Sequence, residues 1–207
     1  MKKSIQLFGA VLLSFFAACA WAQTADMKAL GAALKQGGYV IVFRHGSTNR
    51  DQADTDPLNP DNIAKQRVLS AGGIDVAKQV GSSFKKLGIP LGNVYTSKFN
   101  RAVETGKLIS GGDVTPTFDV TEGGLVVTPI ENDRRAEALK KLAGTMPPQG
   151  KNTLIVTHKP NILDAFGKDW FEVKEGEASI FKPDASGKAV LVARVQAVDW
   201  IKAAGGN

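Results

Sequence analysis

Two uninterrupted apolar runs stand out in the hydrophobic pattern of this chain. One occupies residues 39–43 and reads YVIVF, and the other occupies residues 153–157 and reads TLIVT. Runs of this length without polar alternation are typical of strands that are buried on both faces. We therefore predict that both segments are central strands of a sheet.

Between these strands, apolar residues recur at the spacing of helices. A helix capped by Thr24 is expected to end at a Gly-Gly pair, and a longer helix capped by Ser70 is expected to end at Gly88. Residues 44–62 are polar, rich in Asp, Asn and Pro, and predicted as a loop. The other predicted elements are a strand at 93–96, a helix at 100–109, a strand at 114–120, a helix at 131–142, a short helix from Pro160, and a hairpin of 178–181 with 189–195. Strands that alternate with helices predict one α/β domain, a three-layer α/β/α sandwich with a mostly parallel central sheet.

The N-terminal residues have the composition of a secretory signal peptide. Two lysines give a positive start, the apolar segment 5–18 follows, and Ala20 and Ala22 occupy the positions that signal peptidase reads. The apolar segment is shorter than the roughly 20 residues that a membrane span needs. We therefore predict a signal peptide at residues 1–22, one domain at residues 23–207, and a periplasmic or secreted protein with no transmembrane span after cleavage.

A lipoprotein is the alternative interpretation of the same segment. Cys19 would then be acylated and retained. Lipid-attachment sites usually carry Leu three residues before the cysteine, where this chain has Phe16. Cleavage before Gln23 is therefore the preferred interpretation.

Composition narrows the classes of function. Removing 22 of the 207 residues leaves 185, which suits one domain with an ordinary core. Cys19 is the only cysteine, so the mature chain has neither disulfides nor cysteine metal sites. The formal charge falls from +6 to +4 when two N-terminal lysines are lost. This modest excess fits an anionic ligand, but no basic block is long enough to indicate nucleic-acid binding.

The candidate chemistry begins with the only two histidines of the chain. His45 and His158 each follow one of the two predicted central strands. Ligands of open α/β sheets bind just beyond the carboxyl ends of the strands. If the two strands are neighbours, both imidazoles face one crevice. A lone histidine is more often a surface or core residue, but two in equivalent positions favour an active site.

Arginines accompany both parts of this candidate site. Arg44 and Gly46 flank His45, and a guanidinium can donate two hydrogen bonds to phosphate oxygens. The positive charge also disfavours protonation of the neighbouring imidazole. Arg101 is expected in the first turn of a helix, where the helix dipole favours an anion. The alternative is that Arg101 forms an ion pair with Glu104 on the helix surface.

Taken in order, four motifs resemble those of the histidine phosphatase superfamily, which includes the cofactor-dependent phosphoglycerate mutases. They are Arg44-His45-Gly46, Leu69-Ser70-Ala71-Gly72-Gly73, the set Ser97, Arg101-Ala102 and Thr105, and Thr157-His158. The second motif is similar to the family pattern L-S/T-x-x-G, and the third is similar to S-x-x-x-R-A-x-x-T. The resemblance covers about residues 40–162, which is most of the predicted domain.

The resemblance implies a phosphoric monoester hydrolase that needs no metal and no cofactor. His45 would attack phosphorus and form a phosphohistidine, which water then hydrolyses. Arg44, Arg101 and His158 would bind the phosphate oxygens and balance their charge in the transition state.

The general acid is less clearly indicated. One branch of the family carries an acidic residue directly after the second histidine, where this chain has Lys159. Another branch places a Glu after the strand that follows the Arg-Ala helix, which makes Glu122 the candidate and Glu131 the reserve. Alternatively, Glu122 is a turn residue beside two glycines.

The nucleophile loop also departs from the family pattern. Many members have Asn six residues after the nucleophilic histidine, where this chain has Asp51. Asn49 or Thr48 is the candidate phosphate ligand in its place.

These features favour an exported phosphatase that acts on a small phosphorylated substrate. The stretch between Arg101 and His158 leaves little material for a large lid, which argues against a mutase. The alternatives are a phosphohistidine phosphatase that acts on a protein, or a non-catalytic phosphate-binding envelope protein on the same scaffold. The substrate and the oligomeric state stay open.

Overall fold

The computed structural model describes residues 26–206. The predicted signal peptide at residues 1–22, the Cys19 alternative and the Thr24 cap lie outside the described residues. In chain order, the helices and strands are α1 (Met27–Lys35), β1 (Val40–Arg44), α2 (Ala71–Leu87), β2 (Leu91–Thr96), α3 (Asn100–Ser110), β3 (Thr115–Pro116), α4 (Pro129–Ala143), β4 (Asn152–Thr157), α5 (Lys159–Phe166), β5 (Ala178–Pro183), β6 (Ala189–Val195) and α6 (Ala197–Ala203). None of the helices within residues 26–206 combines the length and apolar character that crossing a bilayer requires.

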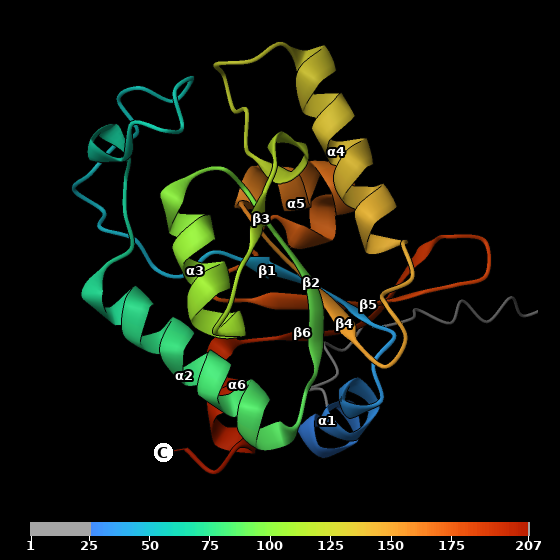
Figure 1. Ribbon diagram of the computed structural model, residues 1–207. Coiled ribbons are helices and arrows are strands. Elements are labelled where there is room, and N and C mark those ends of the chain that lie inside the picture. Colours follow the sequence, from blue (N-terminus) through green and yellow to red (C-terminus); the bar gives the residue numbers. More distant parts are fainter. Residues whose placement is uncertain (1–25, 207) are drawn as a thin grey trace, which may run out of the picture.

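The six strands form one sheet in the order β3-β2-β4-β1-β5-β6. The pairs β2–β3, β2–β4 and β1–β4 are parallel, whereas β5 is antiparallel to both β1 and β6. Figure 1 shows α4 and α5 on one side of this sheet and α1, α2 and α6 on the other. The predicted α/β/α sandwich with a mostly parallel sheet is therefore confirmed.

The two predicted central strands lie side by side in the middle of the sheet and are buried on both faces. Successive side chains of a strand point to opposite faces, so β1 contributes to two apolar clusters. Ile41 and Phe43 pack in the cluster formed with α1, α2, α3 and α6. Val40 and Val42 pack in the cluster formed with α4 and α5. Every residue of β4 is likewise buried.

The helix caps show how far local sequence determines the element boundaries. The Ser70 hydroxyl accepts a hydrogen bond from the Gly73 amide at 3.1 Å and begins α2, as predicted. Gly88 ends the same helix with a φ of 68°, a left-handed conformation that favours glycine. At α1 the cap is Asp26, whose carboxylate accepts from the amides of Lys28 and Ala29.

The predicted strand at residues 114–120 is wrong. Only Thr115–Pro116 form a strand, and Phe118–Val120 form a 3-10 helix capped by the Thr117 hydroxyl. Proline has no amide hydrogen and cannot continue donating to a neighbouring strand, so Pro116 limits the pairing to this short bridge. The C-terminal helix α6 was not predicted, and its Trp200 is fully buried against the core.

Asn152 joins the start of β4 to three other segments. Its side chain is fully buried, and its Nδ2 donates to the carbonyls of Leu34 at 2.8 Å and Pro90 at 3.0 Å. Its Oδ1 accepts from the Tyr39 amide at 3.1 Å. One amide group therefore satisfies backbone groups at the end of α1 and just before β1 and β2.

The substitution Asn152→Ala is expected to destabilise the protein by about 2–4 kcal/mol, because it leaves buried backbone groups without partners. Urea unfolding of both variants and wild type measures the change. Asn93→Ala is the matched control, since Asn93 is exposed on β2, and its effect should stay within about 0.5 kcal/mol. Equal effects of the two substitutions would contradict the structural role of Asn152.

Candidate active site

The two histidines meet where β1 and β4 end. In the parallel register, Arg44 at the end of β1 lies opposite Thr157 at the end of β4, and the residue that follows each strand is a histidine. The His45 amide donates to the Thr157 carbonyl at 3.0 Å. The two ring centroids are 5.0 Å apart, and both side chains are buried. The predicted juxtaposition of His45 and His158 is confirmed.

The hydrogen bond of His45 determines its tautomer. Its Nδ1 lies 2.8 Å from the Gly46 carbonyl oxygen, which can only accept. In the neutral ring Nδ1 therefore carries the proton, and Nε2 keeps its lone pair. The pKa of His45 is lowered well below 6.5, first by burial and then by the neighbouring His158 and arginine charges. The ring is thus neutral at neutral pH and can act as a nucleophile through Nε2.

The His158 ring is fixed through Nε2, whereas the His45 ring is fixed through Nδ1. His158 Nε2 lies 2.7 Å from the hydroxyl of Ser97, whose oxygen accepts from the Phe99 amide at 3.1 Å and whose proton can be donated to Nε2, so that Nδ1 carries the ring proton. Burial, and then the charges of three arginines, lower the pKa of His158 well below 6.5. Its Nδ1 is buried without a hydrogen bond and lies 3.4 Å from a Glu122 carboxylate oxygen. This nitrogen can contact a ligand bound in the cluster.

Arg101 lies in the first turn of α3 and is fully buried. Its Nη1 donates to the Asp54 carboxylate at 3.0 Å, and its Nη2 forms an ion pair with Glu122. The alternative in which Arg101 pairs with Glu104 on the helix surface is therefore wrong. The guanidinium turns inward because α3 begins beside the ends of β2 and β4, where these carboxylates lie.

Arg44 is fixed by a segment far away in the sequence. Its Nη1 donates to the Val173 carbonyl at 2.7 Å, and its Nη2 lies 3.6 Å from Glu175. The same carboxylate accepts from the Thr48 hydroxyl at 3.2 Å, so Glu175 joins the arginine to the loop after the nucleophile. The Gly176 amide also donates to the Arg44 and His45 carbonyls. Residues 173–176 therefore hold the nucleophile turn in place.

A third arginine, which the sequence analysis missed, completes the cluster. The charge of Arg67 lowers the pKa of both His158 and Arg44, which places it near these two residues. Its backbone carbonyl lies 3.4 Å from Arg101 Nη1, and its amide donates to Asp54 at 3.0 Å. In the sequence, the feature that could have pointed to Arg67 is its position just before Leu69-Ser70, where the second of the four motifs begins. Asp54 was also missed, because one Asp among several in a polar loop carries no distinguishing pattern.

Four buried donors of this cluster have no partner within the described protein. They are Arg44 Nε, Arg67 Nε, Arg101 Nε and His158 Nδ1. Buried polar groups are usually hydrogen-bonded, and isolated exceptions need an explanation. Unsatisfied cationic nitrogens on three arginines near two imidazoles are what a site for a multivalent oxyanion requires.

The two acid candidates lie in different surroundings. Glu122 contacts Arg101 and lies near His158, at the edge of the cluster. Glu131 lies in the first turn of α4, where hydrogen bonds from Arg134 and Arg135 lower its pKa to about 2. A carboxyl held ionised in this way is a poor proton donor, so the geometry favours Glu122 over Glu131.

Asn49 and Lys159 are two further residues that the sequence analysis named. Asn49 is half-buried in the loop after His45, and its amide donates to the Val68 carbonyl. Lys159 lies with its Nζ 4.5 Å from the centre of the Phe171 ring. Within residues 26–206 the structure has no group of three or more His, Cys, Asp or Glu side chains arranged to hold a metal ion.

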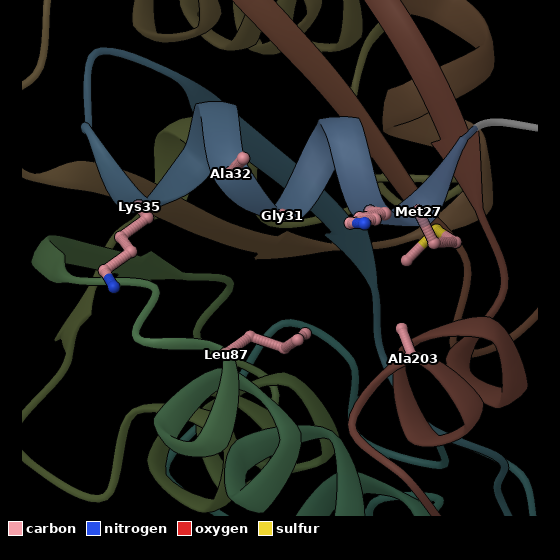
Figure 2. Close-up of a pocket in the computed structure, with 7 residues that line it drawn as sticks. Met27, Gly31, Ala32, Lys35, Leu87 and Ala203 are labelled. Carbon is pink, nitrogen blue, oxygen red and sulfur yellow. The ribbon is translucent and has the colours of Figure 1, made fainter.

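Two surface cavities lie away from the histidines. One, of about 380 Å³, lies between α1, the end of α2 and α6, bordered by Met27, Leu87 and Ala203 (Figure 2). The other, of about 530 Å³, is lined by α4, α5 and the β5–β6 hairpin, including Trp170 and Phe181. Neither cavity is lined by the residues of the cationic cluster.

Comparison with known proteins gives the fold class. No protein-family model and no curated protein sequence matches the chain. The solved structure of the protein histidine phosphatase SixA with tungstate matches with a TM-score of 0.54 and 18% identity, covering 78% of this chain and 98% of that chain. The structure of phosphoserine phosphatase from Entamoeba histolytica with phosphoserine matches with a TM-score of 0.52 and 17% identity, covering 77% of this chain and 97% of that chain. The structure of mycobacterial glucosyl-3-phosphoglycerate phosphatase with inorganic phosphate matches with a TM-score of 0.53 and 15% identity, covering 78% of this chain and 99% of that chain.

These matches establish the fold of the chain, which it shares with the three phosphatases. They span nearly the whole length of the compared structures, so the present domain contains the complete fold. The cluster of His45, His158 and the arginines lies where ligands of open α/β sheets bind, at the carboxyl ends of the strands.

Titration of the two histidines by NMR tests the electrostatics of the site. Because both pKa values are lowered, both rings should stay neutral as the pH falls through 6.5, and they should protonate only well below it. The nitrogen shifts of His45 should show the proton on Nδ1. Either a midpoint near 6.5 or a proton on Nε2 would contradict the proposed state of the nucleophile. Single substitutions of each histidine assign the signals.

Proposed function

We propose that this protein is a phosphomonoesterase that works through a phosphohistidine on His45. The observation that carries the proposal is the free Nε2 of a neutral, buried imidazole beside four unpartnered cationic or imidazole donors. A nucleophilic histidine alone would not explain the unpartnered nitrogens of the three arginines. An anion site without a nucleophile would not need a buried imidazole held in one tautomer.

In the first step, His45 Nε2 attacks phosphorus and forms a P–N bond as the P–O bond to the leaving alcohol breaks. The alkoxide takes a proton as it leaves. In the second step, water attacks phosphorus and gives a proton to the Glu122 carboxylate, the P–N bond breaks, inorganic phosphate is released, and neutral His45 is regenerated. The hydrogen bond from Nδ1 to Gly46 stabilises the ring when phosphorylation makes it cationic.

The arginines bind the equatorial oxygens and balance the charge that builds up during transfer. Arg44, Arg67 and Arg101 each have a free Nε–H, and His158 offers Nδ1. In the free protein, Asp54 and Glu122 occupy the terminal nitrogens of Arg101. These carboxylates keep the guanidinium in place, so a substrate finds the donors already oriented.

Glu122 is the proton donor to the leaving group in this mechanism. Its carboxyl lies at the edge of the cluster, within 3.4 Å of His158. A substrate phosphate that binds the arginines competes with this carboxylate for them.

The substrate class follows from the compared proteins and the predicted signal peptide. The Entamoeba and mycobacterial structures are named as phosphatases of small phosphorylated molecules. We propose a small phosphomonoester as substrate and the periplasm or the extracellular space as the location. Similarity to the protein histidine phosphatase SixA supports a second candidate, a phosphohistidine phosphatase that acts on a protein.

His45→Ala should reduce kcat/KM on p-nitrophenyl phosphate by at least about 10³-fold, because it removes the nucleophile. Acid-quenched wild type should carry a phosphoryl group on His45 by mass spectrometry, and the variant should carry none. Circular dichroism controls for the fold. Turnover of no monoester by folded wild type would contradict the proposal. A preference for a phosphohistidine protein over all small esters would favour the second candidate.

Glu122→Gln should slow hydrolysis of esters with poor leaving groups, such as glycerol phosphate, by roughly 10²- to 10⁴-fold. The effect on p-nitrophenyl phosphate should be smaller, because p-nitrophenolate leaves without a proton. Glu131→Gln is the matched control, since its carboxylate forms ion pairs with Arg134 and Arg135. Equal losses on both esters would remove Glu122 from the role of acid.

A further inference from the structure

Exposed apolar side chains gather on three segments around the candidate active site, residues 54–66, 122–131 and 168–177. Within residues 26–206, half of the twelve large apolar residues that are well exposed lie on them. They are Leu58, Ile63, Leu125, Val126, Ile130 and Phe171. Leu125 is 103% exposed and Ile130 is 81% exposed. Single exposed apolar residues are common, but their concentration around one site indicates a contact surface.

Two of these segments are tied directly to Arg101. Asp54 and Glu122, which both contact its guanidinium, belong to the first and second segments. Leu58 is four residues from the first carboxylate, and Leu125 is three residues from the second. Figure 1 shows both loops standing above the sheet, the first in cyan at upper left and the second in olive at the top. The two loops therefore meet at Arg101, and we call their exposed apolar side chains the apolar entrance.

The third segment brings a cation and an aromatic ring to the same entrance. Val173 and Glu175 hold Arg44, and Phe171 precedes them by a few residues. Lys159, which follows His158 in the sequence, places its Nζ 4.5 Å from the centre of the Phe171 ring. The three segments thus combine exposed apolar side chains with a positive charge, whereas the donors of the cationic cluster are buried.

From this arrangement, and resting on the function proposed above, we propose that the substrate is an amphiphilic phosphomonoester. Its phosphate binds the cationic cluster, and the hydrocarbon part of its leaving alcohol lies on the apolar entrance formed by the first two segments. The cationic cluster is complementary to the phosphate, and the exposed side chains of the two segments offer apolar surface. A purely polar sugar phosphate would leave Leu125 and Ile130 in water.

A series of alkyl phosphates tests this inference. The readout is the ratio of kcat/KM for octyl phosphate to that for methyl phosphate, measured below the micelle concentration. A fully buried methylene contributes about 4-fold, so partial burial predicts a ratio on the order of 10- to 100-fold for wild type. The double variant Leu125→Ser/Ile130→Ser should lower this ratio at least about 5-fold. Both side chains are exposed, so their loss removes no core packing.

Leu191→Ser is the matched control, because Leu191 is also exposed but lies on the edge strand β6. It should keep the wild-type ratio. A ratio near one with both esters hydrolysed overturns the inference and leaves the phosphatase function standing, as does an unchanged ratio in the double variant. Hydrolysis of neither ester nor of p-nitrophenyl phosphate overturns both this inference and the phosphatase function.

Phosphatidic acid in phosphatidylcholine vesicles then tests whether the enzyme takes amphiphiles from a bilayer. Turnover of phosphatidic acid that falls in the double variant places the substrate in the bilayer.

Discussion

The parallel pairing of β1 with β4 is the constraint on which the rest of the structure depends. It aligns Arg44 with Thr157, and the next residue of each strand is then a histidine facing the same crevice. Burial on both faces of these strands fixes the register, because a slip by one residue would turn every side chain to the opposite face. Asn152 strengthens the same register from the opposite end of the strands. The chemistry proposed for the site is therefore built on the core.

Electrostatic balance explains how so many cations can lie together in the absence of a ligand. Arg101 is shared between Asp54 and Glu122, and Arg44 lies beside Glu175. These carboxylates offset the mutual repulsion of the guanidiniums and hold them in fixed orientations. The histidines respond in the opposite way, because burial and the arginines keep both rings neutral. One site thus contains permanent cations beside neutral imidazoles.

Much of this arrangement could be predicted from sequence, for identifiable reasons. The central strands were recognisable as apolar runs, and Ser70 and Gly88 marked the ends of α2 through local hydrogen bonding and backbone conformation. His45, His158 and Arg101 stood out because each follows or opens a regular element. Arg67 and Asp54 did not, since they lie in a loop whose path depends on tertiary contacts with Arg101. The strand expected at residues 114–120 failed at Pro116, and Glu175 acts on Arg44 from 131 residues away.

The central claim is that His45 Nε2 and the donors around it converge on one phosphoryl group. A crystal structure of the protein with vanadate tests this most directly, because vanadate adopts the five-coordinate geometry of phosphoryl transfer. Vanadium is expected to bond to His45 Nε2, with its equatorial oxygens contacting Arg44, Arg101 and His158. Vanadate bound elsewhere, or bound in the cluster with His45 Nε2 turned away from it, would contradict the account.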